Sequence, residues 1–180
     1  KIVKGFRHIL QGAEEGFMLQ PNFINGLKQL SKYHYTYDLL IYANQIQEAI
    51  ELIKSVEDLP IVLDHIAKPS IKTKSIQDWE RDIKSLAKYP NLYCKISGMA
   101  TEADWTTWNP EDLEPYLDIV VEAFGVNRLL FGSDWPVCLV ASSYERWLNT
   151  IQDYFKKFSI SEQEKIFALN CESFYTLEKA

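Results

Sequence analysis

Short apolar runs alternate with longer amphipathic stretches along the chain. Apolar residues recur at helical spacing in several stretches, as in Ile46, Ala49, Ile50 and Ile53, which is typical of a helix with one buried face. Five apolar runs are predicted to be strands: 2–7, 36–42, 61–65, 91–97 and 128–133. Strands at intervals of roughly 25–35 residues, each followed by a helix, indicate βα units and a parallel sheet.

The helices carry recognisable start and stop signals. Asn109 and Pro110 form a cap and a first turn, and Gly125 suits the end of that helix. Ser161 and Glu164 are spaced as a capping box for a last helical region. The predicted helices are 22–33, 46–53, 76–86, 110–124 and 147–158, followed by a helical region that extends to about 177.

Five parallel strands fit two architectures. One is a small doubly wound sheet, and the other is most of a (β/α)8 TIM barrel, whose full length is typically about 250 residues. No Gly-rich phosphate loop follows any predicted strand, which disfavours a nucleotide-binding sheet. No linker interrupts the pattern, so residues 1–180 are predicted to form a single domain.

Composition narrows the class of protein. Hydrophobic residues make up 47% of the chain and charged residues 24%, which is typical of a folded globular domain. The net charge is −6 and the basic residues are scattered, so we expect neither a nucleic-acid surface nor a membrane span. The three cysteines are isolated in sequence and favour a reduced, cytoplasmic setting.

Asp134 is the first candidate for chemistry. It follows the apolar run 128–133 directly, and Pro136 prevents that strand from continuing. The carboxyl ends of strands are where parallel α/β folds bind ligands. An Asp in this position is also a common turn residue, so the segment alone leaves catalysis open.

Three more polar residues lie near the ends of predicted strands. They are Arg7, His65 and Lys95. Side chains alternate between the two faces of a strand, so each shares a face with the residue two positions away. The pairs, with Asp134 included, are Arg7 and Gly5, His65 and Leu63, Lys95 and Ser97, and Asp134 and Gly132. If all four point into a barrel, an Asp and a His can activate a water or ligate a metal that does so. Two cations beside them suit a carboxylate or a developing oxyanion.

Structural roles remain open for the same residues. His65 could be a hydrogen-bonded residue at the rim, and Lys95 could reach solvent. Arg7 could form an ion pair with Asp38 or Asp64. Cys138 has no histidine near it in sequence, so we interpret it as a small core residue.

Several phrases of the sequence resemble one family. They are KGFRHIL (4–10), YDLLI (37–41), VLDHIAKP (62–69), YCKISGMATEADW (93–105) and LLFGSDWPVC (129–138). Together, and in this order, they resemble the amidohydrolase-related family (amidohydrolase 2). The likeness is greatest to its lactonase branch, which includes L-fuconolactonase and 2-pyrone-4,6-dicarboxylate lactonase.

The resemblance implies a (β/α)8 barrel that hydrolyses a cyclic ester. Asp134 would be the general base, His65 a second catalytic residue, and Arg7 and Lys95 substrate-binding residues. His65 and Asp134 would be tentative ligands of one divalent metal such as zinc. The HxH pair that the family carries on its first strand is absent, so the chain is expected to supply strands four to eight, an incomplete barrel of about five βα units.

Two expectations follow from an incomplete barrel. The chain starts at Lys1 within strand-like sequence, so it reads as a piece of a longer polypeptide. The strands at 2–7 and 128–133 would both have open edges, which favours a homo-oligomer or another covering segment.

Three hypotheses for function remain. The first is hydrolysis of a small-molecule lactone, such as a sugar-acid lactone. The second is a metal-dependent decarboxylase on the same barrel, and the third is a truncated fragment without catalysis.

Overall fold

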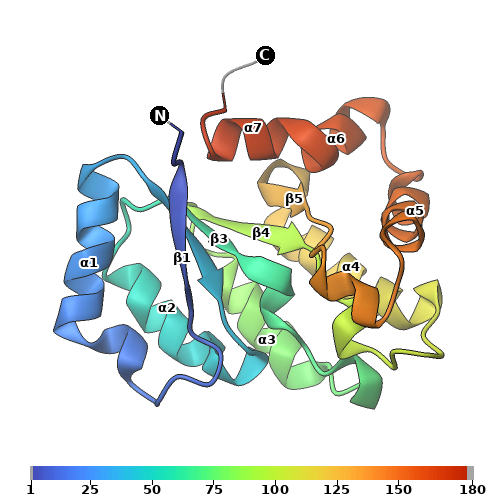
Figure 1. The fold of residues 1–180 in the computed structure, drawn as a ribbon, viewed down its shortest axis with the longest axis horizontal. Coiled ribbons are helices and arrows are strands. Elements are labelled where there is room, and N and C mark those ends of the chain that lie inside the picture. The colour runs from blue at the N-terminus through green and yellow to red at the C-terminus, as the bar shows by residue number, and fades with distance from the viewer. Residues whose placement is uncertain (1, 178–180) are drawn as a thin grey trace.

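Five parallel strands form one sheet in strict chain order (Figure 1). The structure is a computed structural model and describes residues 2–177. The strands are β1 (Gly5–Ile9), β2 (Thr36–Leu40), β3 (Ile61–Leu63), β4 (Leu92–Ile96) and β5 (Leu129–Phe131). Because every strand pairs in parallel with the next, all five carboxyl ends lie along one edge of the sheet.

The strands lie where the apolar runs predicted them, with shorter bounds. β1 is shifted toward the C-terminus relative to the predicted 2–7, because its pairing with β2 runs from Gly5 opposite Thr36 to Ile9 opposite Leu40. β3 has only three residues and ends at Leu63, two residues before the predicted end. That early end matters for the site, because His65 lies outside the strand.

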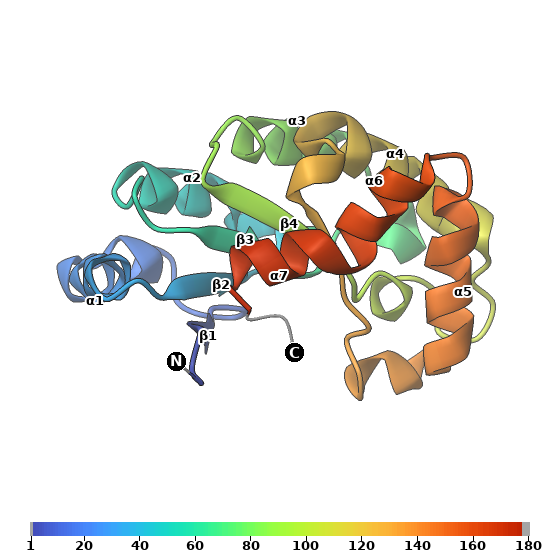
Figure 2. The same cartoon turned by 90° about the horizontal axis from the view of Figure 1, so that it is seen from above.

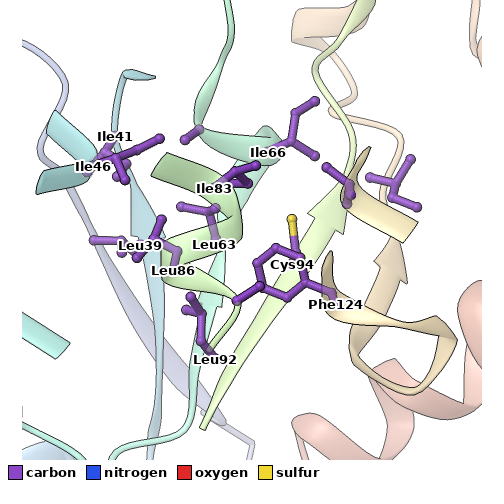
Figure 3. Packing of buried hydrophobic residues seen from close by; sticks show 14 of the residues in the cluster. Leu39, Ile41, Ile46, Leu63, Ile66, Ile83, Leu86, Leu92, Cys94 and Phe124 are labelled. Carbon is purple, nitrogen blue, oxygen red and sulfur yellow. The ribbon is translucent and has the colours of Figure 1, made fainter. Parts of the chain in front are cut away.

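Four helices cover one face of the sheet and bury the main core (Figure 2). They are α1 (Pro21–Lys32), α2 (Ile46–Lys54), α3 (Gln77–Leu86) and α4 (Pro110–Phe124). Leu63, Leu92 and Cys94 point from the strands toward Ile83 and Leu86 of α3 (Figure 3). All five side chains are fully buried, and each large apolar side chain of this kind contributes about 1.5–3 kcal/mol on burial.

The helix caps agree with the sequence in one case and differ in another. Asn109 caps α4 in a capping box with Asp112, and Gly125 ends the helix with a φ of 66°. The box predicted at Ser161 and Glu164 is wrong by two residues, since Ser159 and Glu162 form it. Both pairs have the same spacing, so the local signal did not distinguish them.

On the opposite face of the sheet, which we call the inner face, α7 (Asn170–Phe174) packs against the strands. It is preceded by α5 (Tyr144–Phe155), whose Trp147, Ile151 and Phe155 belong to the main core, and by α6 (Ile160–Glu164) and a π-helical turn at Lys165–Leu169. α7 runs across the sheet on the side away from α3 (Figure 2). Its Phe174 packs with Val62 and Leu130 in a second, smaller apolar cluster.

The two edge strands differ, which corrects the expectation that both are open. The β5 edge is covered by the C-terminal region, where the Asn170 side chain donates 2.7 Å hydrogen bonds to the carbonyls of Val126 and Leu129. β1 pairs on one side only within residues 2–177, and Ile9 is 64% exposed. Across those residues, the structure contains no helix with the length and apolarity to cross a bilayer.

Candidate active site

The segment after β3 has an unusual backbone. His65, Ile66, Ala67 and Lys68 have φ values of 55°, 47°, 59° and 48°, a left-handed run without glycine. Such residues cost of the order of 1–3 kcal/mol each and persist only where the surroundings hold them. Here the Ile66 side chain is fully buried in the main core, and Trp79 Nε1 donates a 2.9 Å hydrogen bond to the Ile66 carbonyl.

This turn decides where His65 points. Alternation along β3 groups His65 with Ile61 and Leu63, but both of those side chains lie in the helix-side core. The left-handed backbone breaks the alternation and carries the imidazole to the carboxyl ends of β4 and β5. Strand alternation was therefore the wrong argument for His65, although the residue does reach the predicted edge of the sheet.

The His65 ring is held from three sides. Its Nδ1 lies 2.7 Å from Ser97 Oγ, and its Nε2 lies 3.5 Å from Asp134 Oδ1. Its Cγ and Nδ1 side lies against Gly98, where an added Cβ atom would come within 2.8 Å of the ring. Gly98 also has a φ of 61°, so glycine is favoured there both by the backbone and by the ring.

Asp134 presents one carboxylate oxygen to His65 and keeps the other free of protein partners. It follows β5 with a φ of 55°, and its side chain is 11% exposed. Among the described residues, its Oδ2 is buried and has no hydrogen-bond partner. An unpaired buried carboxylate oxygen is costly, which makes it a natural place for a water or substrate hydroxyl.

Burial sets the charge of His65. It lowers the pKa of the imidazole from its ordinary value of 6.5, although the carboxylates of Asp64 and Asp134 act in the opposite direction. The ring is therefore neutral at pH 7, with one nitrogen bearing a proton. A carboxylate facing Nε2 favours the tautomer with the proton on Nε2, in which Nδ1 accepts from the Ser97 hydroxyl.

A partly buried ion-pair network lies beside the His65 and Asp134 pair, on the inner face. Asp64 is fully buried; its Oδ2 accepts a 3.1 Å hydrogen bond from Arg7, and its Oδ1 forms an ion pair with Lys95 at 2.9 Å. Lys95 also contacts Asp38, and the Tyr175 hydroxyl donates to Asp38 at 2.8 Å. The strand register explains this proximity, because Arg7 lies opposite Asp38, and Asp38 opposite Val62.

The contacts of the network show which groups Arg7 and Lys95 bind. Arg7 forms the ion pair with Asp64 that was one of its alternatives, and its side chain stays 49% exposed. Lys95 does not reach solvent freely, since its side chain is 19% exposed. Burial lowers the pKa of Lys95, but Asp64 and Asp38 outweigh it and the net pKa is raised, so the ammonium stays charged.

Four residues of this constellation were not among the predicted site residues. Asp38 and Asp64 were considered only as partners of Arg7, although Asp64 shares the strand face of Val62. Ser97 was noted only for its alternation with Lys95, and Tyr175 had no local signal, since it lies 137 positions from its partner Asp38. Cys138 is 3% exposed, and burial raises its thiol pKa, as expected for a core residue.

The side chains present do not form a complete zinc site by themselves. His65 and Asp134 offer two donor atoms 3.5 Å apart, whereas a catalytic zinc typically has three protein ligands. No cluster of three or more His, Cys, Asp or Glu side chains suited to a metal occurs in the part of the chain that the structure describes. What these residues do offer is a carboxylate and a neutral imidazole that meet at one point, with cations beside them.

Comparison with known proteins identifies relatives of this chain. An L-fucono-1,5-lactonase from Burkholderia multivorans is 32% identical over 97% of this chain and 63% of its own length. An L-rhamnono-gamma-lactonase from Scheffersomyces stipitis is 26% identical, over 98% of this chain and 60% of its own. The chain thus spans less than two thirds of these curated relatives.

A solved structure has a fold similar to that of this chain. An amidohydrolase from Burkholderia multivorans with bound zinc matches with a TM-score of 0.93 and 32% identity, covering 97% of this chain and 65% of that one. The five βα units are accordingly part of a TIM barrel of the amidohydrolase type. The amidohydrolase family model matches residues 3–177, and the chain belongs to the amidohydrolase family, with relatives in its lactonase branch.

Proposed function

We propose that the protein hydrolyses the cyclic ester of a sugar-acid lactone, with Asp134 as the general base. The observation that carries the proposal is the meeting of Asp134 and neutral His65 at the carboxyl edge of the sheet, at 3.5 Å. The substrate class is proposed from the names of two relatives, an L-fucono-1,5-lactonase and an L-rhamnono-gamma-lactonase. The three free cysteines suit a reducing compartment such as the cytoplasm.

The reaction begins with a water placed at the free Oδ2 of Asp134. The carboxylate takes one proton as the water oxygen attacks the lactone carbonyl carbon, and negative charge develops on the carbonyl oxygen. The Nε2–H of His65 donates to that oxygen, which a buried and uncharged imidazole does without adding a net charge. The ring C–O bond then breaks, and the proton held by Asp134 passes to the departing alkoxide to give the open hydroxy acid.

The two cations have different parts in this proposal. Arg7 is half exposed and has donors beyond its bond to Asp64, so it is suited to bind substrate hydroxyl or carboxylate oxygens. Lys95 is occupied by two carboxylates, so it supports the site by fixing Asp64 and Asp38, and its contact with substrate stays a prediction.

His65 and Asp134 would be the two ligands that this chain offers to a divalent metal such as zinc. A metal held there would need further ligands, and it would supply a Lewis acid for the lactone carbonyl. Activity measured before and after chelation and zinc addition tests this point. Loss on chelation and recovery with zinc would show that the full-length protein needs a metal, whose ligand set would have to extend beyond His65 and Asp134.

Asp134→Asn in the full-length protein tests the proposal. The amide cannot accept the water's proton, so we expect kcat for L-fucono-1,5-lactone and L-rhamnono-gamma-lactone to fall by about 10²–10⁴-fold. The expected product of the unaltered protein is the hydroxy acid, without release of CO₂.

The matched control is Asp153→Asn, which removes an exposed carboxylate that pairs with Lys156 and should leave kcat unchanged. Circular dichroism of both variants checks that the fold is intact. Retained turnover in the folded Asp134→Asn variant would remove Asp134 from the mechanism.

A further inference from the structure

Lys68 is a partly buried cation that the proposed reaction does not use. Its side chain is 12% exposed, and its Nζ lies 2.6 Å from Glu102 Oε1 and 3.2 Å from Thr101 Oγ1. Lys68 closes the left-handed run 65–68 that begins with His65. The ion pair therefore ties the turn after β3 to the loop after β4.

The other end of this tie returns to His65. Thr101 Oγ1 donates a 2.8 Å hydrogen bond to the Gly98 carbonyl, and Gly98 is the residue on which the His65 ring lies. These contacts form a closed path. It runs from His65 along the backbone to Lys68, from Lys68 Nζ to Thr101 Oγ1, and from Thr101 through Gly98 back to the His65 ring. The imidazole is one member of this closed set of contacts, through its approach to Gly98.

A third element holds the middle of the turn. Trp79 is 4% exposed, and its indole N–H donates to the Ile66 carbonyl at 2.9 Å. Ile66 is β-branched and has a φ of 47°, a conformation that such residues rarely adopt. The run is therefore maintained by contacts to α3 and to the 98–102 loop, and not by local preference.

From this geometry we infer that Lys68 and Glu102 are positioning residues for His65, and that Trp79 supports them. Their ion pair holds the left-handed turn, and the turn aims the imidazole at Asp134. Without the pair, the run relaxes toward ordinary backbone, and alternation along β3 would carry the ring toward the helix-side core. The expected effect on turnover rests on the proposed function. The expected effect on the orientation of the His65 ring does not.

The test uses Lys68→Met, Glu102→Ala and the double variant in the full-length protein. Each single change should lower kcat by about 10–100-fold, the range typical of partners that orient metal-ligating histidines, with KM little changed. Because the two residues act as one pair, the double variant should be no worse than the poorer single variant. Histidine ¹⁵N spectra, assigned with His65→Gln, should change from one tautomer to a mixture in each variant.

A control variant and a second test variant separate positioning of His65 from general stability of the fold. Lys72→Met removes a neighbouring ion pair with Asp104, at 3.0 Å and with a side chain 66% exposed, and should change neither kcat nor the His65 signals. Trp79→Phe keeps the packing but removes the donor to Ile66, and should reproduce the effect if Lys68→Met does not fold.

The spectra also separate this inference from the proposed function. Unchanged His65 signals in a folded Lys68→Met or Trp79→Phe variant would overturn the inference, whatever the activity. If the unaltered protein hydrolyses no lactone while the His65 signals of Lys68→Met shift as described, the proposed function fails and the positioning role stands.

Discussion

At the scale of single residues, His65 combines burial with a titratable ring. Its pKa is lowered from 6.5 chiefly by burial, so the folded state binds its proton less readily than the unfolded chain. The unfolded chain is protonated first as the pH falls, and its protonation favours unfolding. His65 thus supports the fold fully above pH 6.5 and loses that contribution as the pH falls from 6.5 through the lower folded pKa.

This gives a prediction for stability against pH. Between about pH 7.5 and about pH 5, the unaltered protein should lose more of its free energy of unfolding than His65→Gln, whose amide does not titrate. Urea denaturation at a series of pH values measures the free energy of unfolding of both proteins. Subtracting one curve from the other removes the titration of the carboxylates, which the two proteins share. Parallel curves for the two proteins would contradict a lowered pKa for His65.

At the scale of elements, the strands and helices were predictable and the turn after β3 was not. Apolar runs mark the five strands, and the spacing of Ile83 and Leu86 marks the buried face of α3. Residues 65–68 contain no glycine or asparagine, so nothing local signals four positive φ values. The turn comes from contacts with Trp79 and Glu102, which are close only after folding.

The same limit applies to the candidate site. Alternation places Asp64 with Val62 on the inner face, but it gives no sign that Asp64 is the acceptor shared by Arg7 and Lys95. The part of Tyr175 depends on α7 crossing the sheet, which no local pattern reports. Asp134 was found because its signal is local, an apolar strand that ends in a carboxylate.

Gly98→Ala tests how closely the β4 loop controls His65. The new Cβ would lie 2.8 Å from the imidazole, at a φ of 61°, so the ring has to move. We expect a loss of about 1–3 kcal/mol in the free energy of unfolding, together with a loss of kcat of about 10²-fold. Kinetics and urea denaturation of the folded variant measure both.

Gly16→Ala is the matched control for backbone strain. Gly16 also has a positive φ, 83°, but a Cβ there meets nothing within 4 Å. It should therefore show a stability loss without a loss of kcat. Equal kinetics in the two variants would mean that the contact between Gly98 and His65 does not matter for turnover.

At the scale of the whole molecule, the sheet is protected on one edge and exposed on the other. Asn170 and the π-helical turn cover β5, whereas β1 pairs only with β2 among the described residues. Ile9 at 64% exposure and Val3 at 50% add apolar side chains to unpaired backbone groups. An exposed apolar edge of this kind recruits a further strand.

The 180-residue chain on its own should therefore self-associate through β1. Sedimentation equilibrium over a range of concentrations should give masses above the 20.9 kDa of one chain, and Ile9→Lys should return them toward that value, because an edge lysine opposes strand pairing. Ile160→Lys removes an apolar side chain of similar exposure, 76%, from α6 and should leave association unchanged. A monomer of 20.9 kDa at every concentration, with one cooperative melting transition, would show instead that β1 is stable as a free edge, so that closure of the barrel is not required for this part of the fold.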